Sequence, residues 1–387
     1  MRLSRHANMF YTLALIASAA TAPAENFLVY FGTYTNALSR GIYVSRLDAE
    51  TGKLSAPELA AATPSPSFVN LSPDGKSLYA ANEVNGFSDY SIENGGAVSA
   101  FAIDKTSGQL TFLNQKCSGG TDPCHVSVDA TGKVLFVANY SSGSMKAFLL
   151  DTNGGLGEGG TFVQDTGHGV NPVRQAGPHA HFICADPSNR FALACNLGTD
   201  TVTVYPFTTN DATLVASKFE RFHVPDGSGP RHLAFSRDGK FVHVINEMGC
   251  TVTTFAWDSE KGKLDLIETV SALPPGVAVQ NSFTAAEILV HPAGKYVYAT
   301  VRGHDSVSVF SADERSGRLT LVQNVSAGGK VPRGLGIDPT GRWLIVANQM
   351  SDSAVEFMIE SATGKLSPAK QALKIGSPVD VKFVKAN

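Results

Sequence analysis

The sequence predicts an all-β fold made of repeated units, and three observations lead to this prediction. The chain of 387 residues contains 37 Gly and 19 Pro, a density of turn signals that is too high for a helical bundle. A phrase in which a turn precedes an apolar β-rich run occurs six times. A second phrase, of alternating apolar residues, occurs seven times. One repetitive domain therefore accounts for the length better than two or three unrelated domains.

The first element, residues 1–24, is predicted to be a signal peptide. Arg2 and Arg5 precede an apolar segment from Met9 to Ala20, and Ala22-Pro-Ala24 supplies small residues before a cleavage site at Glu25. A membrane anchor is the alternative, but about twelve apolar residues are fewer than the roughly twenty that span a bilayer. We therefore expect a periplasmic or secreted protein with no membrane attachment after cleavage.

Residues 25–387 are predicted to form a single soluble domain with a small negative charge. Cleavage removes two of the 31 Lys and Arg residues, so 29 remain against 34 Asp and Glu residues, a formal charge of −5. This balance lacks the basic surplus that nucleic-acid binding requires. We expect a monomer that does not bind nucleic acid.

The first phrase marks one turn and one strand in each repeat. The spacings between its turn residues are 57, 57, 50, 55 and 47 positions, which is the period of a propeller blade and not of a helical solenoid. The six copies are Ser72–Asn82, Asp129–Asn139, Asp186–Asn196, Ser236–Asn246, His291–Val301 and Asp338–Asn348, with turn residues Gly75, Gly132, Asn189, Gly239, Gly294 and Gly341.

The second phrase follows each copy of the first, and one further copy precedes them all. Seven copies in a mature chain of about 363 residues give about 52 residues per unit, enough for four short antiparallel strands. The sequence thus predicts a seven-bladed β-propeller of four-stranded antiparallel blades. The seven copies are Ile42–Leu54, Val98–Leu110, Met145–Leu156, Val202–Leu214, Val252–Leu264, Val307–Leu319 and Val355–Leu366.

The chain ends are predicted to close the ring by sharing one blade. Residues 378–384 resemble the strand that opens the other repeats, and Phe27–Thr33 resembles the strand that comes next. Pairing of these two segments would remove an exposed sheet edge.

Titratable residues depart from the repeat where the opening strands begin and the second strands end. The opening strand of a blade lines the central channel, and the second strand is antiparallel to it, so both sets of positions lie at one mouth of the channel. Buried charges that gather in one cavity carry desolvation costs and often mark a functional site. The alternative is an ion network that only fills the channel. The candidates are His125, His179, His181, Arg231, His232, Glu247, Glu287, Arg302 and Arg333.

This set of side chains suits an anionic or oxygen-rich small molecule. Arginine binds carboxylate or phosphate groups and stabilises an oxyanion, and Glu or His serves as a base. Serine-hydrolase, HExxH zinc, P-loop and Rossmann motifs are absent from the sequence in any structural context that would support them. Because no tight ligand spacing demands a metal ion, we expect neither a metal nor another cofactor.

The same residues resemble a known family. The segments that carry the resemblance are Gly177-Pro-His-Ala-His181, Gly229-Pro-Arg-His232, Ile245-Asn-Glu247, Ala286-Glu287, Arg302-Gly-His-Asp305 and Pro332-Arg-Gly334. They are similar to motifs of the seven-bladed propeller lactonases, which include propeller-type 6-phosphogluconolactonases and carboxymuconate lactonizing enzymes, over about Phe27 to Val384.

The resemblance implies a lactone hydrolase that acts on a sugar-derived lactone at the channel mouth. It implies catalytic roles for His181, Arg231, Glu247 and Arg302, and the choice between His179 and His181 stays open. His125, His179, His232, Glu287 and Arg333 are then expected to contact the substrate. The alternatives are a carboxymuconate-type lactonizing enzyme and an exported propeller that binds a partner without catalysis. Export also leaves open whether the lactone is phosphorylated.

Five cysteines are too few for a disulfide scaffold, although export would let disulfides persist. Two local pairs are plausible from the sequence, Cys117 with Cys124 and Cys184 with Cys195. Cys250 is left over, and we expect it to be a buried small hydrophobic residue.

Overall fold

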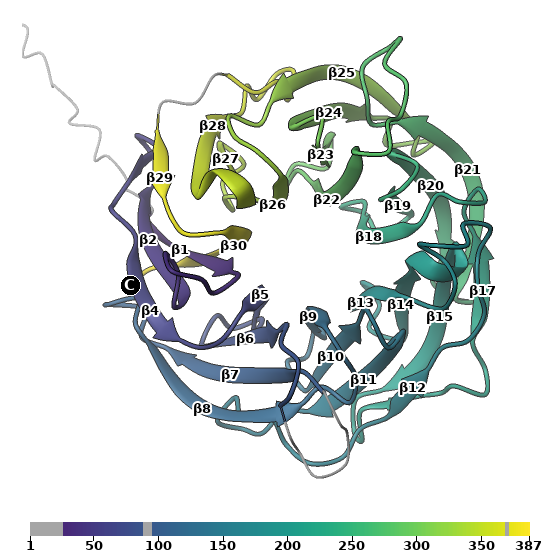
Figure 1. Cartoon of the computed structure of the whole chain (residues 1–387), viewed down its shortest axis with the longest axis horizontal. Helices are drawn as coiled ribbons and strands as arrows, with labels where there is room; N and C mark the ends of the chain where they lie inside the picture. The colour runs from purple at the N-terminus through teal and green to yellow at the C-terminus, as the bar shows by residue number, and fades with distance from the viewer. Residues whose placement is uncertain (1–25, 88–94, 368–370) are drawn as a thin grey trace, which may run out of the picture.

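The computed structural model describes residues 26–87, 95–367 and 371–387 of the chain. The predicted signal peptide lies outside these residues. Within them, seven antiparallel sheets stand around a central channel as the blades of a closed ring (Figure 1). The predicted all-β, seven-bladed architecture is confirmed.

Each blade has four strand positions from the channel outward. In two blades the outermost position is divided between two short strands, so that β3 and β4 both pair with β2, and β16 and β17 both pair with β15. From the inner to the outer strand, the first blade contains β30 (Pro378–Lys385), β1 (Asn26–Thr33), β2 (Gly41–Asp48), β3 (Lys53–Leu54) and β4 (Glu58–Ala62); the second contains β5 (Pro66–Leu71), β6 (Ser77–Asn82), β7 (Ala97–Ile103) and β8 (Leu110–Cys117). The third contains β9 (Pro123–Val128), β10 (Val134–Asn139), β11 (Ser144–Leu149) and β12 (Phe162–Gln164); the fourth contains β13 (Ala180–Ala185), β14 (Phe191–Asn196), β15 (Thr201–Thr208), β16 (Thr213–Leu214) and β17 (Glu220–His223). The fifth contains β18 (Pro230–Phe235), β19 (Phe241–Asn246), β20 (Thr251–Asp258) and β21 (Lys263–Ser271); the sixth contains β22 (Thr284–Val290), β23 (Tyr296–Arg302), β24 (Ser306–Ala312) and β25 (Leu319–Ser326); the seventh contains β26 (Pro332–Ile337), β27 (Trp343–Asn348), β28 (Ser353–Met358) and β29 (Ala372–Lys374).

Helical structure is limited to two 3₁₀ turns in the described ranges, η1 (Leu197–Thr199) and η2 (Gln349–Ser351). No helix among the described residues is long and apolar enough to cross a bilayer.

The ring closes as predicted, by backbone pairing of the two ends of the chain. The C-terminal strand β30 runs antiparallel to β1, from the pair Phe27 and Lys385 to the pair Thr33 and Pro378. β30 is therefore the inner strand of a blade whose other strands come from the N-terminus (Figure 1). This pairing covers the inner edge of β1, which would otherwise be left exposed at the seam.

The turn residues of the first phrase adopt a left-handed backbone conformation. φ is +63° at Gly75 and +74° at Gly341. The fourth blade has Asn189 at this position with φ +59°, a conformation that Asn tolerates better than most non-glycine residues. The shared turn geometry explains why this phrase could be recognised in every complete repeat.

The hydrophobic core lies between the blades. In the described residues it consists of seven clusters, one between each pair of adjacent sheets. Hydrogen bonds from large aromatic side chains tie neighbouring blades together: Tyr30 Oη donates to Gly108 O at 2.9 Å, and Trp343 Nε1 donates to Ala49 O at 2.9 Å. Burial of each large aromatic or aliphatic side chain contributes about 1.5–3 kcal/mol to the stability of the fold. This packing between the blades holds in place the groups that point into the channel.

Candidate active site

A shift in strand pairing places the first side chains of the inner strands at the channel mouth. In every blade the pairing register between the inner strand and its neighbour slips by one residue just after the inner strand begins. Bulges of this kind re-aim side chains and are common at barrel rims and beside active sites. The residues at the shift are Ser67, Cys124, His181, Arg231, Ala286, Arg333 and Val379.

A cavity of about 250 Å³ lies at this mouth. Its lining includes four of the nine predicted site residues, which are His181, Glu247, Arg302 and Arg333. The convergence that the sequence predicted is therefore present for these four, which come from four different blades. The other lining residues are Tyr34, Glu83, Cys124, Tyr140 and Arg174.

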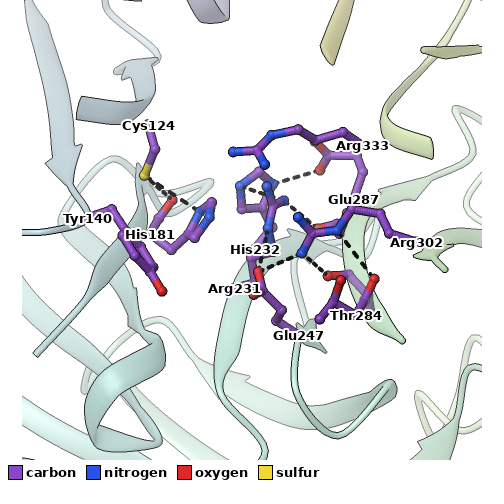
Figure 2. Close-up of polar contacts among 12 residues, drawn as sticks. Cys124, Tyr140, His181, Arg231, His232, Glu247, Thr284, Glu287, Arg302 and Arg333 are labelled. Carbon is purple, nitrogen blue, oxygen red and sulfur yellow. Dashed lines mark hydrogen bonds and ion pairs between the residues drawn. The ribbon is translucent and has the colours of Figure 1, made fainter. Parts of the chain in front are cut away.

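Glu247 is the centre of the charge network (Figure 2). It follows β19 and is only 5% exposed, and its two oxygens face three guanidinium groups. Oε1 accepts from Arg174 Nη2 at 2.5 Å, and Oε2 lies 2.8 Å from Arg302 Nη2 and 3.2 Å from Arg231 Nε. Burial alone would raise the pKa of Glu247, but Arg302 and Arg231 hold that pKa well below its usual range. Glu247 is therefore an ionised carboxylate at any physiological pH.

Arg231 lies beneath the floor of the cavity and is 3% exposed. Its Nη1 donates to Ala286 O at 2.6 Å, whereas its Nε has no hydrogen-bond partner among the described residues, because the approach to Glu247 is poorly angled. Burial, with the neighbouring charges of Arg302 and Arg333, lowers the pKa of Arg231 to about 10. It remains a cation at neutral pH.

The site as a whole carries a net positive charge. Three arginines, Arg174, Arg302 and Arg333, line the cavity against the two carboxylates of Glu83 and Glu247, which leaves a formal charge of +1 when histidine is neutral. Arg302 also donates to the backbone, from Nη2 to Ala285 O at 3.2 Å, so that its guanidinium is held at the end of β23. This charge balance fits an anionic group or a developing oxyanion.

His181 presents a neutral imidazole to the same cavity. Burial, then the charge of Arg231, keeps the pKa of His181 well below its usual range. Its Nδ1 lies 3.7 Å from the thiol of Cys124, and its ring packs edge-on against Tyr140, with ring centres 5.4 Å apart (Figure 2). An uncharged imidazole among guanidinium groups has the lone pair that a general base requires.

His179 lies beside the cavity and not among the residues that line it. Its ring stacks on Tyr140 at 4.5 Å, and its Nδ1 lies 3.1 Å from Tyr140 O. Of the two histidines between which the sequence left the choice open, His181 is the one that lines the cavity.

Three further predicted site residues, His125, His232 and Glu287, lie in a layer below the cavity. The His125 ring is packed between Phe68 and Phe182, with ring centres 4.3 and 4.1 Å away. His232 Nδ1 lies 2.9 Å from Glu287 Oε1. All three side chains are buried and none lines the cavity, because they follow the register shift by one position and so lie deeper in the channel.

Tyr34 and Arg174 line the cavity but were not predicted from the sequence, and their positions in the chain explain why. Tyr34 directly follows β1, as Glu83 follows β6 and Glu247 follows β19, but its blade is divided between the chain ends, so the repeat did not reveal it. Arg174 lies in the connection between β12 and β13, outside either repeated phrase, and has no counterpart by which to recognise it.

The suggested disulfides are wrong, because all five cysteines are free. Cys184 lies opposite Leu193 in the sheet, so Cys195 is its diagonal neighbour, too far for the Cα separation of about 4.4–6.8 Å that a disulfide needs. Cys117 ends an outer strand, whereas Cys124 is at the start of the next blade's inner strand. Cys250 is buried, as expected. No group of three or more His, Cys, Asp or Glu suited to a metal ion occurs within the described part of the chain.

Comparison with known proteins identifies the class to which this fold and site belong. The family model described as lactonase, 7-bladed beta-propeller, matches residues 28–383. The chain belongs to this family, as its motifs indicated.

The individual relatives carry two related names. A 6-phosphogluconolactonase of Bacillus subtilis is 35% identical over 92% of this chain and 98% of its own, and a 6-phosphogluconolactonase of Formosa agariphila is 31% identical over 90% and 96%. A solved structure described as the periplasmic gluconolactonase of Pseudomonas aeruginosa superposes with a TM-score of 0.84 at 30% identity, covering 94% of this chain and 100% of its own.

Proposed function

We propose that the cavity at the channel mouth hydrolyses a sugar-derived lactone to the corresponding hydroxy acid. The observation that carries this proposal is the neutral imidazole of His181 in a cavity that it shares with Arg174, Arg302 and Arg333. Lactone hydrolysis needs a base for water and positive charge for the tetrahedral oxyanion, and this cavity supplies both. Membership of the lactonase family supports the same reaction.

His181 is a better candidate for the base than Glu247. Both oxygens of Glu247 already face arginines, and these ion pairs would have to weaken before Glu247 could take a proton from water. His181 is uncharged, and its Nδ1 faces the thiol of Cys124 at 3.7 Å and not a guanidinium group. We assign Glu247 the task of holding Arg174, Arg231 and Arg302 in place, and His181 the task of activating water.

We propose that hydrolysis proceeds through a tetrahedral intermediate in this cavity. The oxygen of water forms a bond to the lactone carbonyl carbon while its proton passes to His181. Arg302 and Arg333 stabilise the oxyanion of the tetrahedral intermediate. The intermediate collapses by breaking the bond to the ring oxygen, which takes the proton from His181 to become a hydroxyl group. The product is a hydroxy acid, whose carboxyl group releases its proton to solvent, and the positive cavity also accommodates the resulting carboxylate.

The substrate that we favour is an aldonolactone without a phosphate group, which the protein would encounter outside the cytoplasm. The reason is the predicted signal peptide, because phosphorylated sugars are made and kept in the cytosol. We also propose that the protein acts as a periplasmic or secreted monomer, since the two ends of one chain close the ring without a strand from another copy.

The test is a hydrolysis assay of the purified mature protein, residues 25–387, on glucono-δ-lactone, 6-phosphogluconolactone and carboxymuconate, with and without a chelator. Spontaneous ring opening is subtracted from each rate. We expect both sugar lactones to open faster than in buffer, and the unphosphorylated one to have the higher kcat/KM. Cyclisation of carboxymuconate without lactone hydrolysis would support a lactonizing enzyme, and no turnover at all would support a binding module.

A further inference from the structure

A chain of polar contacts runs down the channel from the cavity floor to a buried carboxylate. Arg231 Nη1 lies 3.2 Å from His232 Nε2, and His232 Nδ1 lies 2.9 Å from Glu287 Oε1 (Figure 2). The same Glu287 oxygen accepts from Ile288 N at 3.1 Å. These three side chains are 1–5% exposed, so solvent does not compete for their hydrogen bonds.

Only one arrangement of protons satisfies these contacts. A guanidinium group only donates, so His232 Nε2 must be the unprotonated acceptor for Arg231. The neutral imidazole then carries its proton on Nδ1 and donates it to Glu287. Burial, with the charge of Arg231, lowers the pKa of His232 well below its usual range, in agreement with a neutral ring. Glu287 thereby selects the tautomer that can receive Arg231.

Packing alone does not require a histidine and a carboxylate at this depth. The corresponding position after the register shift is Phe68 in one blade and Phe182 in another. Both phenylalanine rings contact His232, at 5.6 and 5.2 Å between ring centres. A buried histidine and glutamate are costlier to desolvate than a phenylalanine, so their presence indicates a polar task.

That task is the orientation of Arg231. Its Nη1 points down the channel, where it contacts Ala286 O and His232 Nε2. The Nε edge of the guanidinium, 3.2 Å from Glu247, is then turned toward the cavity. We infer that His232 and Glu287 are positioning residues, which fix the guanidinium of Arg231 beneath Glu247 and His181 through two successive hydrogen bonds. This inference rests on the proposed lactone hydrolysis only for its kinetic consequences.

The experiment compares His232→Phe, Glu287→Leu and Glu287→Gln with a matched control, His243→Phe. His243 belongs to the same blade as His232, is also 1% exposed, and lies with its Nδ1 3.0 Å from Thr254 Oγ1, away from the arginines of the cavity. Glu287→Gln keeps an oxygen that can accept from Nδ1. Lactone hydrolysis is measured from pH 5 to 8, with thermal unfolding for each variant.

We expect His232→Phe and Glu287→Leu to lower kcat/KM at least about 10-fold, because each loses a hydrogen bond that involves a charged group. We expect kcat/KM of Glu287→Gln and His243→Phe to stay within about 3-fold of the wild type. Displacement of Arg231 should also raise the pKa of His181, so that the acid limb of the kcat/KM profile moves to higher pH. Equal losses in His232→Phe and His243→Phe, with no shift of the limb, would overturn the inference.

An independent measurement separates this inference from the proposed function. Two-bond ¹H–¹⁵N spectra of the histidine rings report the tautomer whether or not a lactone is hydrolysed. We expect the Nδ1–H form of His232 in the wild type and in Glu287→Gln, and its loss in Glu287→Leu. An Nε2–H form in the wild type would refute the inference, even if hydrolysis proceeds.

Discussion

Replacing Arg302 by alanine separates chemistry from folding in this site. Its guanidinium lines the cavity and lies 2.8 Å from Glu247 Oε2. The carboxylate would not be left unpaired, because Arg174 and Arg231 still face it. We therefore expect the variant to fold into the same ring and to fail at the chemical step.

The size of the effect follows from the role proposed for Arg302. Removing one donor from an oxyanion site typically lowers kcat by about 10²–10³-fold, or about 2.7–4 kcal/mol of transition-state stabilisation. The loss of one buried ion pair from a network that keeps two others should cost about 1–3 kcal/mol of unfolding free energy, a shift of only a few degrees in Tm for a domain of this size.

The assay is initial-rate lactone hydrolysis, with Arg318→Ala as the matched control. Arg318 belongs to the same blade and lies at the same 2.8 Å from its partner, Glu268, but its side chain is 61% exposed and far from the mouth. Arg318→Ala should retain full kcat, since an exposed ion pair contributes only ~0–1 kcal/mol. If kcat of Arg302→Ala stays within about 3-fold of the wild type, Arg302 has no place in the mechanism.

Three further outcomes follow. If His181 is the base, its protonation abolishes activity as the pH falls through its lowered pKa. We therefore expect kcat/KM to stay constant from pH 8 to below ~6.5, the usual pKa of histidine. A kcat/KM that falls to half its maximum at or above that pH would contradict a neutral buried imidazole. Thiol titration of the denatured, unreduced protein should find five free cysteines, and a count of three or one would restore a disulfide. Truncation after Gly376 removes β30 and opens the ring, so cooperative thermal unfolding should be lost; a sharp transition near the wild-type Tm would show that closure is dispensable.

The repeat determined how much of the fold could be predicted. Turn residues such as Gly75 and Asn189 share one backbone geometry, so their spacing revealed the period of the blades. The second phrase gave the number of blades, and the strand-like segments at the two chain ends gave the closure of the ring. Disulfide pairing was beyond reach, because it depends on register across a sheet: Cys184 faces Leu193, and a slip of two residues would have brought it opposite Cys195.

The candidate site was predictable where it departs from the repeat and not elsewhere. Arg302 and Glu247 stand at equivalent strand ends and were found by comparing blades. How deep each side chain lies in the channel was the hardest feature to predict. The register shift separates His181, which lines the cavity, from His125 and His232, which lie one layer below, although all three are among the first three residues of an inner strand. Arg174 could not be found, because it lies in a connection without a repeat.

The most direct test of the account is a crystal structure of the mature protein soaked with gluconate, the product expected from glucono-δ-lactone. We expect the carboxylate within about 3 Å of the guanidinium groups of Arg302 and Arg333, with His181 facing the carboxylate carbon. Gluconate bound between blades or at the opposite end of the channel, with the mouth cavity holding only water, would contradict it.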